Sequence, residues 1–215
     1  RDEFNHLMDS GLFDELVSKQ LIIQHDIEQV RQLPAGYFLK IVPKQISFLV
    51  EPFEWTFSEW HQAALAFIQI NQIALTYGMI LKDATPFNFA KVGGCMILFD
   101  TTSFQFFSEN SPWVAYRQFC VEFLGPLALM KYGGSVWSRL TRSYFKGLPL
   151  EFISQALPIT SYFNATCLMH LHIHSRFEPK KKGVMAKKEM KGFTTEGLFY
   201  LLSSLEKGIN AWSRN

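Results

Sequence analysis

One segment constrains the fold of this chain more than any other: a long, almost wholly apolar helix that begins near residue 57. Thr56 and Glu59 have the spacing of the capping box that opens a helix, and Gly78 supplies a common stop signal. Between them only a narrow stripe is polar, formed by Gln62, Gln69, Gln72 and Thr76. A helix with so narrow a polar face is buried on nearly every side. The sequence therefore predicts a domain built around a central helix over residues 57–77.

The composition agrees with a folded core of that kind. Hydrophobic residues make up 48% of the 215 residues and aromatic residues 15%, which excludes a mainly disordered protein. The net charge of +2 gives no electrostatic reason to expect a nucleic acid or an anionic membrane as a partner. The richest apolar stretch, residues 119–130, contains Glu122 and Pro126 and is shorter than the roughly 18 residues that a membrane span needs.

Cysteine usage and the start of the chain add two expectations. Three cysteines are too few for a disulfide framework, so we expect a reducing, cytoplasmic setting in which Cys95, Cys120 and Cys167 act as small buried hydrophobic residues. The sequence starts at Arg1 without an initiator methionine or a signal peptide, so we expect an excerpt from a longer chain.

Shorter elements surround the central helix in the prediction. Strand-like runs at 37–42 and 46–51 flank Pro43-Lys44-Gln45 and predict a hairpin. A tighter hairpin is predicted over residues 89–100, around Gly93-Gly94. The other predicted helices cover residues 14–20, 111–125, 136–145 and 149–156, the second of them interrupted by Gly125-Pro126.

The end of the chain divides into a basic stretch and an amphipathic helix. Residues 178–192 hold six lysines and two glutamates, which is typical of a solvated linker; a nucleic-acid contact is the alternative, although aromatic residues for stacking are sparse there. Within residues 193–215, Thr195 can cap a helix with an apolar stripe of Leu198, Leu201, Leu202, Leu205 and Ile209. That stripe needs a partner surface, either in this domain or in something downstream.

Three polar residues after the central helix are spaced like a phosphotransfer site. Asp83 is followed by Asn88 five residues later, and Asp100 comes twelve further on, after an apolar run. A carboxylate can take the proton of a substrate hydroxyl, and a second carboxylate with an amide oxygen suits Mg²⁺. This order is that of protein-kinase-like sites. The same residues can instead cap a turn, occupy a left-handed position or end a strand.

Several longer runs carry a family resemblance. The most specific is WVAYRQFC at 113–120, and the others are HLMDSGL at 6–12, EPFEW at 51–55, LKDA at 81–84 and FDTTSF at 99–104. Over residues 5–175 the chain resembles the N-terminal region of large bacterial class I S-adenosylmethionine-dependent methyltransferases, which include nodulation-protein-related methyltransferases. In that family this region looks like a divergent kinase-like lobe, akin to the aminoglycoside phosphotransferases.

The resemblance implies an α+β, protein-kinase-like fold with a small or truncated N-lobe and a mainly helical C-lobe. Residues 1–56 would be the N-lobe remnant and hinge, and residues 57–177 the C-lobe with the segment that resembles a catalytic loop. The linker and the C-terminal helix would follow at 178–192 and 193–215.

The resemblance also implies roles for individual residues. Asp83 and its neighbour Lys82 would be catalytic, and Asn88 and Asp100 would hold the magnesium of Mg-ATP. Glu51 and Phe53 would lie at the hinge, where backbone groups meet the adenine, and Lys40 is the candidate strand lysine for the cofactor. The sequence departs from the kinase pattern in four places: Leu81 for the usual His, Lys82 for Arg, Thr101-Thr102 after Asp100, and no glycine-rich loop before residue 50.

Two functional hypotheses follow. In the first, the chain is the kinase-like N-terminal module of a methyltransferase-type protein and binds Mg-ATP as a phosphotransferase. In the second, it is a catalytically inactive scaffold that positions a methyltransferase domain or its substrate. S-adenosylmethionine would bind only to a covalently linked domain outside these residues, because the chain lacks the glycine-rich strand-turn-helix signature of a Rossmann fold.

Alternating histidines near the end of the chain suggest a further possibility. On a strand, His170, His172 and His174 would all face one side and could bind a transition metal. On a helix they would diverge and serve a structural role.

Overall fold

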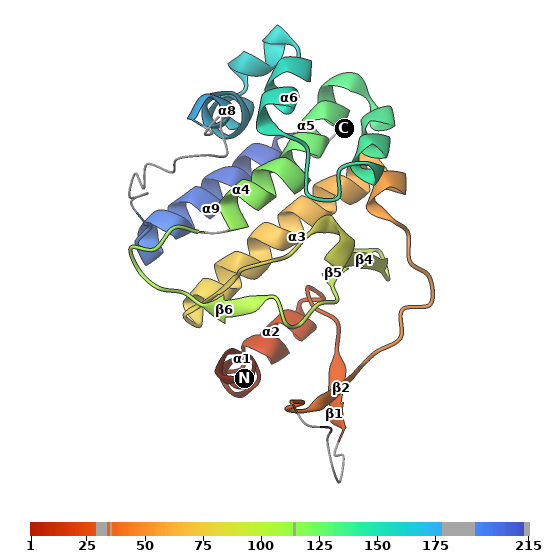
Figure 1. The fold of residues 1–215 in the computed structure, drawn as a ribbon, viewed down its shortest axis with the longest axis vertical. Helices are drawn as coiled ribbons and strands as arrows, with labels where there is room; N and C mark the ends of the chain where they lie inside the picture. Colours follow the sequence, from red (N-terminus) through yellow and green to blue (C-terminus); the bar gives the residue numbers. More distant parts are fainter. Residues whose placement is uncertain (29–33, 35, 114, 178–191, 213–215) are drawn as a thin grey trace.

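The central helix is α3 (Phe57–Thr76), as the sequence predicts. The computed structural model describes residues 1–28, 34, 36–113, 115–177 and 192–212, and α3 runs through the middle of them (Figure 1). Thr56 Oγ1 accepts the backbone N–H of Glu59, whose carboxylate accepts the Thr56 N–H at 2.8 Å, so the capping box is confirmed. Of the residues in α3 only Ser58 and Thr76 are exposed, because other elements cover the rest of the helix.

Two small antiparallel pairs follow α3. β3 (Met79–Leu81) pairs with β6 (Phe104–Phe106), and β4 (Phe89–Val92) pairs with β5 (Cys95–Leu98) in the stretch between them. Gly93 and Gly94 have φ angles of 59° and 92°, which suit the two-residue turn that joins β4 to β5. The tight hairpin is therefore confirmed, although its second strand ends at Leu98 and not at Asp100.

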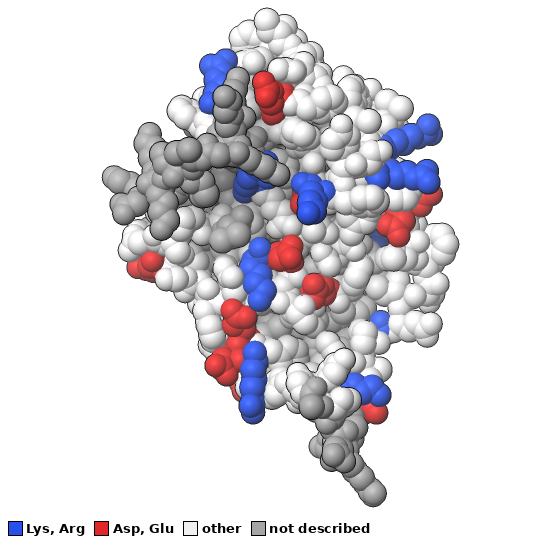
Figure 2. All heavy atoms as spheres, in the orientation of Figure 1, with Lys and Arg blue, Asp and Glu red and all other residues white. Residues whose placement is uncertain are grey.

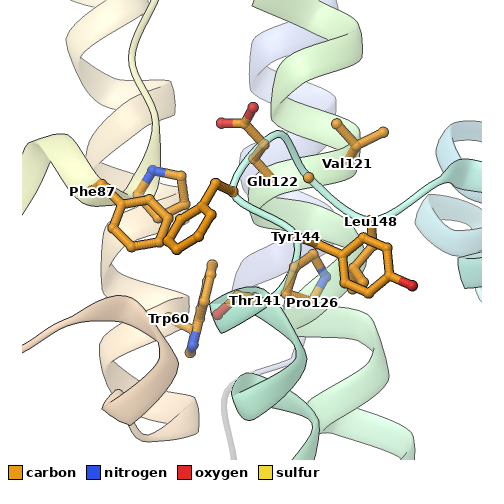
Figure 3. A pocket seen from close by; sticks show the side chains of 11 residues that line it. Trp60, Phe87, Val121, Glu122, Pro126, Thr141, Tyr144 and Leu148 are labelled. Atoms are coloured by element: carbon orange, nitrogen blue, oxygen red, sulfur yellow. The ribbon is translucent and has the colours of Figure 1, made fainter.

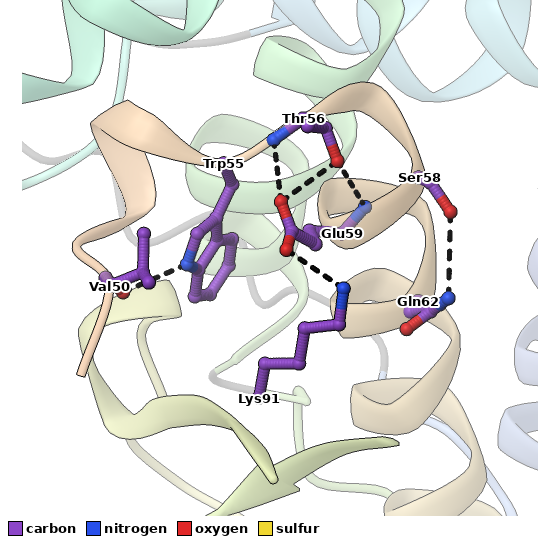
Figure 4. A network of polar contacts seen from close by, with 7 residues as sticks. All are labelled: Val50, Trp55, Thr56, Ser58, Glu59, Gln62 and Lys91. Atoms are coloured by element: carbon purple, nitrogen blue, oxygen red, sulfur yellow. Dashed lines mark hydrogen bonds and ion pairs between the residues drawn. The ribbon is translucent and has the colours of Figure 1, made fainter. Parts of the chain in front are cut away.

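A polar network ties the start of α3 to this hairpin (Figure 4). Lys91 Nζ on β4 lies 3.0 Å from Glu59 Oε1 and so links the strand to the capping box. Just before the cap, Trp55 Nε1 donates to the Val50 carbonyl at 2.9 Å, and its buried ring packs edge-on against Trp60. These contacts fix the path of residues 50–56 into α3.

The N-terminal segment packs against the same core. α1 (Asp2–Asp9) and α2 (Leu12–Ser18) lie beside α3 and β6, and the helix predicted over 14–20 is therefore found two residues earlier. Their buried side chains join a single hydrophobic core with those of α3: Leu7, Leu12, Phe13 and Leu16. Residues on both sides of the predicted boundary at residue 56 therefore contribute to the same hydrophobic core.

The predicted hairpin between 37–42 and 46–51 is wrong. β2 (Lys40–Pro43) pairs antiparallel with β1 (His25–Glu28), an upstream strand, and Ile41 lies opposite Ile27. Pro43 is the last residue of β2, and the Lys44 N–H that follows still donates to the Gln24 carbonyl at 2.8 Å. Residues 46–51 form no strand; the chain runs from β2 to the short 3-10 helix η1 (Pro52–Glu54).

One continuous helical run crosses the other side of α3. It consists of α4 (Ala115–Phe119), the π-helical segment η3 (Cys120–Leu124) and α5 (Gly125–Gly133). The predicted interruption at Gly125-Pro126 is wrong, because the wider π turn before Pro126 accommodates a residue that has no N–H donor. The run starts at Ala115 and not at Ser111, which pairs with Phe193 in an isolated bridge.

The C-terminal helix is α9 (Thr195–Asn210), and it packs along α3 (Figure 1). Thr194, not Thr195, caps it by accepting the Gly197 N–H at 3.1 Å. Gln72 Nε2 on α3 donates to Glu206 Oε2 of α9 at 2.9 Å. Four members of the predicted stripe are fully buried: Leu198, Leu202, Leu205 and Ile209. The partner surface of this stripe is therefore inside the domain.

Short helical segments complete the fold. They are η4 (Ser135–Arg142), α6 (Leu150–Ala156), η5 (Ile159–Phe163), α7 (Ala165–Cys167), η6 (Leu168–Ile173) and α8 (His174–Phe177). The helix predicted over 149–156 is confirmed, whereas that predicted over 136–145 is a 3-10 helix that ends at Arg142. The predicted basic linker lies outside the described residues except for Gly192.

Acidic and basic side chains alternate over the face shown in Figure 2. Within the described ranges, no helix combines the length and the apolar character that crossing a bilayer requires.

Candidate functional site

Two backbone hydrogen bonds bring together the segments that carry the predicted phosphotransfer residues. The Lys82 N–H donates to the Ser103 carbonyl, and the Phe99 N–H donates to the Asn88 carbonyl, both at 2.9 Å. The residues that directly follow Lys82 and Phe99 are the two predicted carboxylates. The loop after β3, the start of β4 and the end of β5 therefore lie side by side.

Asp100 organises the turn that follows β5. Its Oδ1 accepts the Thr102 N–H at 2.8 Å and the Thr102 hydroxyl at 2.7 Å, and its Oδ2 accepts the Ser103 hydroxyl at 2.9 Å. The structural alternative that the sequence offered for Asp100 was the end of a strand, but β5 ends at Leu98, and Asp100 instead holds the turn that follows it. A carboxylate oxygen has two lone pairs, so Oδ2 keeps one for a further donor or a cation.

Asn88 is occupied in a comparable way. Its Oδ1 accepts both the Thr85 N–H at 2.9 Å and the Thr85 hydroxyl at 3.0 Å, which closes the short 3-10 helix η2 (Pro86–Asn88). Both lone pairs of that amide oxygen are used. A metal ion at this oxygen would have to replace one of the Thr85 contacts.

Asp83 lies at the exposed end of a hydrogen-bonded chain of side chains. Gln118 Nε2, on α4, donates to Asp83 Oδ1 at 3.1 Å and to Glu122 Oε2, one turn along the helix, at 3.3 Å. One amide therefore joins two carboxylates, and it holds Asp83 in a fixed orientation at the edge of the helical run.

Glu122 is the buried member of that chain and lines a pocket. Its side chain is only 8% exposed, although it is an acid. Burial, the largest influence, raises the pKa of Glu122 to about 7; the Gln118 hydrogen bond opposes this and the Asp83 charge reinforces it. Phe87, Trp60 and Tyr144 line the same pocket, and Figure 3 shows the carboxyl group of Glu122 extending away from their rings.

The two predicted lysines form ion pairs elsewhere. Lys82 Nζ lies 3.3 Å from Glu3 Oε2, so it joins the loop after β3 to α1. Lys40 Nζ lies 2.7 Å from Glu28 Oε2 within the β1–β2 pair, which projects from the body at the bottom of Figure 1. Neither contact is to a carboxylate of the candidate site.

Of the two predicted hinge residues, Phe53 lies in η1 and Glu51 is its N-cap, and the backbone carbonyl of each accepts a hydrogen bond within the domain. The Glu51 carbonyl accepts the Glu54 N–H at 2.9 Å, and the Phe53 carbonyl accepts the Ser138 hydroxyl at 3.1 Å. The Arg142 guanidinium lies over the Phe53 ring, 5.6 Å from its centroid. These contacts join the segment before α3 to η4.

The alternating histidines lie on helical turns and take structural partners. His170 Nδ1 is 2.8 Å from the Tyr116 hydroxyl, and the buried His172 bridges the Ser154 and Ser161 hydroxyls at 2.8 and 2.7 Å. Within the described ranges, no three His, Cys, Asp or Glu side chains come together as a metal site. The three histidines therefore lie on helical turns and not on a strand.

The cysteines match the expectation of small buried residues in two of three cases. Cys120 and Cys167 are fully buried, and Cys95 is partly exposed. Burial raises the pKa of both buried thiols to about 12, so neither offers a thiolate nucleophile near neutral pH.

Sequence reasoning missed Gln118 and Glu122 as members of the site. A signal was present, because Glu122 is the single acid in the apolar stretch 119–130 and lies four residues after Gln118, on the same helix face. Their proximity to Asp83 depends on the packing of α4 against the loop after β3, which local patterns do not encode.

Comparison with known proteins gives one distant relative. Nodulation protein NoeA of Rhizobium meliloti (strain 1021) is 23% identical to this chain in an alignment of 197 positions that covers 84% of the chain. The match spans 41% of NoeA, so the chain corresponds to well under half of that relative's length. No family model matches the chain, and no solved structure matches it with significance. The chain is thus similar to part of a nodulation protein.

Proposed function

We propose that this chain is a kinase-like, Mg-ATP-dependent phosphotransfer module of a larger, methyltransferase-type protein. One observation carries the proposal: backbone pairing places the loop of Asp83 and Asn88 beside the end of β5 with Asp100. The order is a buried helix, a strand, the loop, a hairpin, the acid and a strand that returns to pair with the first. Kinase-like sites need this juxtaposition of a base and metal ligands.

The exposed Asp83 carboxylate would accept the proton of an acceptor hydroxyl as its oxygen attacks the terminal phosphorus of ATP and ADP leaves. Gln118 would keep that carboxylate oriented. Asp100 Oδ2 and the Asn88 amide oxygen are hard donors that suit Mg²⁺, with water completing the coordination. The metal would offset the negative charge of the phosphates. In this proposal Glu51 and Phe53 meet the adenine, Lys40 would exchange its ion pair with Glu28 for a contact to the nucleotide, and Lys82 supports the loop.

A thermal-shift titration with Mg-ATP tests the proposal. A ligand that binds only the folded state raises its stability by about 2.7 kcal/mol at a concentration of 100 times Kd. The wild-type chain should show a concentration-dependent rise in Tm, and Asp100→Asn should lose it. Asp14→Asn, which changes an exposed acid on α2, is the matched control and should keep it. A wild-type chain that shows no response to Mg-ATP contradicts the proposal.

A second candidate is a non-catalytic scaffold that docks a linked methyltransferase domain. The observation that favours it is a pair of apolar side chains on η5, Ile159 and Phe163, which are 78% and 90% exposed. The buried stripe of α9 no longer supports docking, since α3 already covers it. Under this candidate, Mg-ATP gives no thermal shift, and Phe163→Asp weakens association with the rest of the parent protein in analytical ultracentrifugation.

A further inference from the structure

The β1–β2 pair reaches the body of the domain through one buried side chain. His25, the first residue of β1, is only 6% exposed, whereas the other three residues of β1 are exposed and no residue of β2 is buried. The rest of the pair projects from the body (Figure 1). Two strands of four residues are only marginally stable in water on their own. The packing around His25 therefore decides whether this pair stays ordered on the body.

The His25 ring packs against both N-terminal helices. Its centroid is 4.4 Å from that of the Phe13 ring on α2 and 6.0 Å from that of the Phe4 ring on α1. Neither Nδ1 nor Nε2 of His25 has a hydrogen-bond partner among the described residues. Burying an unpaired charge costs far more free energy than burying a neutral polar group. This site therefore accepts the neutral ring of His25 and disfavours the imidazolium.

Charged groups around His25 do not supply the missing partner. Burial is the largest influence on the pKa of His25 and lowers it from 6.5, and the charge of the exposed Asp26 offsets this only in part. The other titratable groups on or next to the elements that pack against His25 are Arg1, Asp2, Glu3, His6, Asp9, Asp14, Glu15, Lys19, Glu28, Lys40 and Lys44. None of them bonds to either ring nitrogen. The Arg1 guanidinium lies 4.5 Å from the centroid of Phe38, before β2, and because arginine stays charged this second contact does not respond to pH.

We propose that His25 is a pH-dependent switch: when its ring takes up a proton, the β1–β2 pair leaves α1 and α2, and when the proton is lost, the pair docks again. Water solvates the imidazolium in the released state, which the apolar site cannot do. The docked ring has the lower pKa, so docking is favoured above pH 6.5 and is lost as pH falls below 6.5 through the pKa of the docked ring. The opening is local, because backbone hydrogen bonds from Leu98 of β5 to Leu21 and Ile23 hold the chain just before His25.

Hydrogen exchange of the 215-residue chain tests this switch, measured by mass spectrometry at pH 7.5 and 5.0 and corrected for the intrinsic pH dependence of exchange. Protection of residues 24–28 and 40–44 should fall about ten-fold at the lower pH, the change expected for each pH unit between 6.5 and the lowered pKa. His25→Phe keeps an apolar ring that cannot titrate, so its protection should be equal at both pH values. The matched control is His61→Gln on α3, which keeps a donor for the Ile209 carbonyl and should retain the response of the wild type.

NMR spectroscopy of the wild-type chain follows the same event without any variant. Nuclear Overhauser effects between the rings of His25 and Phe13 should be present at pH 7.5 and absent at pH 5.0, and they decide the question alone if His25→Phe does not fold. Unchanged protection in the wild type, an equal loss in His25→Phe, a response that disappears in His61→Gln, or ring contacts that persist at pH 5.0 each overturns the inference. Because no nucleotide is present, the result is independent of the proposed phosphotransfer.

Discussion

The carbonyl oxygen of Asn88 accepts the backbone N–H of Phe99 at 2.9 Å, which joins the loop after β3 to the end of β5. The side chain of the same asparagine closes η2 through two hydrogen bonds from Thr85. Asn88 therefore fixes the loop from both its backbone and its side chain. Whatever the loop binds, its shape depends on this residue.

Replacing Asn88 with alanine should lower the free energy of unfolding by about 1–2 kcal/mol, the usual cost of a lost capping side chain and of an unpaired N–H. Urea denaturation followed by tryptophan fluorescence measures it. Asn88→Asp is the matched control, because a carboxylate keeps the acceptor for Thr85 and should retain most of the stability. Equal losses in both variants would show that the Thr85 contacts do not hold the loop.

Glu122 should make stability depend on pH. Its pKa is raised from 4.5 to about 7 in the folded state, so that state binds more protons than the unfolded chain between these values. Stability contributed by this group is fully present below pH 4.5 and is lost as pH rises through 7. With about 1.4 kcal/mol per pKa unit, the loss is at most about 3.5 kcal/mol.

Glu122→Gln isolates this effect from that of other titrating groups. The difference in unfolding free energy between wild type and Glu122→Gln, measured by urea denaturation from pH 4.5 to 8.5, should move in favour of the variant as pH rises. A difference that stays constant over this range would mean that the carboxyl titrates alike in both states.

Local patterns predicted those elements whose signals lie within one segment. The capping box and Gly78 bound α3, two consecutive glycines with positive φ define the β4–β5 turn, and the apolar stripe marks α9 as an amphipathic helix, although its partner surface was left open. In each case the deciding residues are neighbours in sequence, or share one face of a helix. The order of Asp83, Asn88 and Asp100 can likewise be read from one short stretch of sequence.

Local patterns could not predict which distant segments of the chain pack or pair with one another. β2 pairs with β1, which lies twelve or more residues upstream, and Ile41 lies opposite Ile27. It does not pair with the adjacent run at 46–51, as the sequence predicted. The π turn before Pro126 depends on how the helical run packs on its neighbours. For the site, the amide of Gln118 reaches Asp83 only because α4 and the loop after β3 are packed together. The kinase-like fold itself stays a prediction.

The junction of η3 and α5 leaves little room for a side chain at Gly125. A Cβ there would collide with Ile153 Cδ1 and lie 3.0 Å from the Cys120 carbonyl oxygen. Gly125→Ala should therefore destabilise the chain by about 1–3 kcal/mol, the usual cost of overpacking. Ile153→Val removes the clashing methyl group. In a double-mutant cycle by thermal denaturation, the double variant should be more stable than the sum of the single effects predicts, whereas strict additivity would contradict this contact.

Docking of α9 on α3 should account for much of the domain's stability. Leu202 is fully buried in the α9 stripe, and Leu202→Ala should cost about 2–5 kcal/mol because it leaves a cavity. Tyr200, two residues away on the same helix, is 79% exposed, so Tyr200→Ala should change stability by about 0.5 kcal/mol or less. Both variants are compared by urea denaturation under the same conditions. If the two substitutions had equal effects, the stripe would not be the surface that holds α9 on α3, and the amphipathic helix would again be free to bind a separate partner.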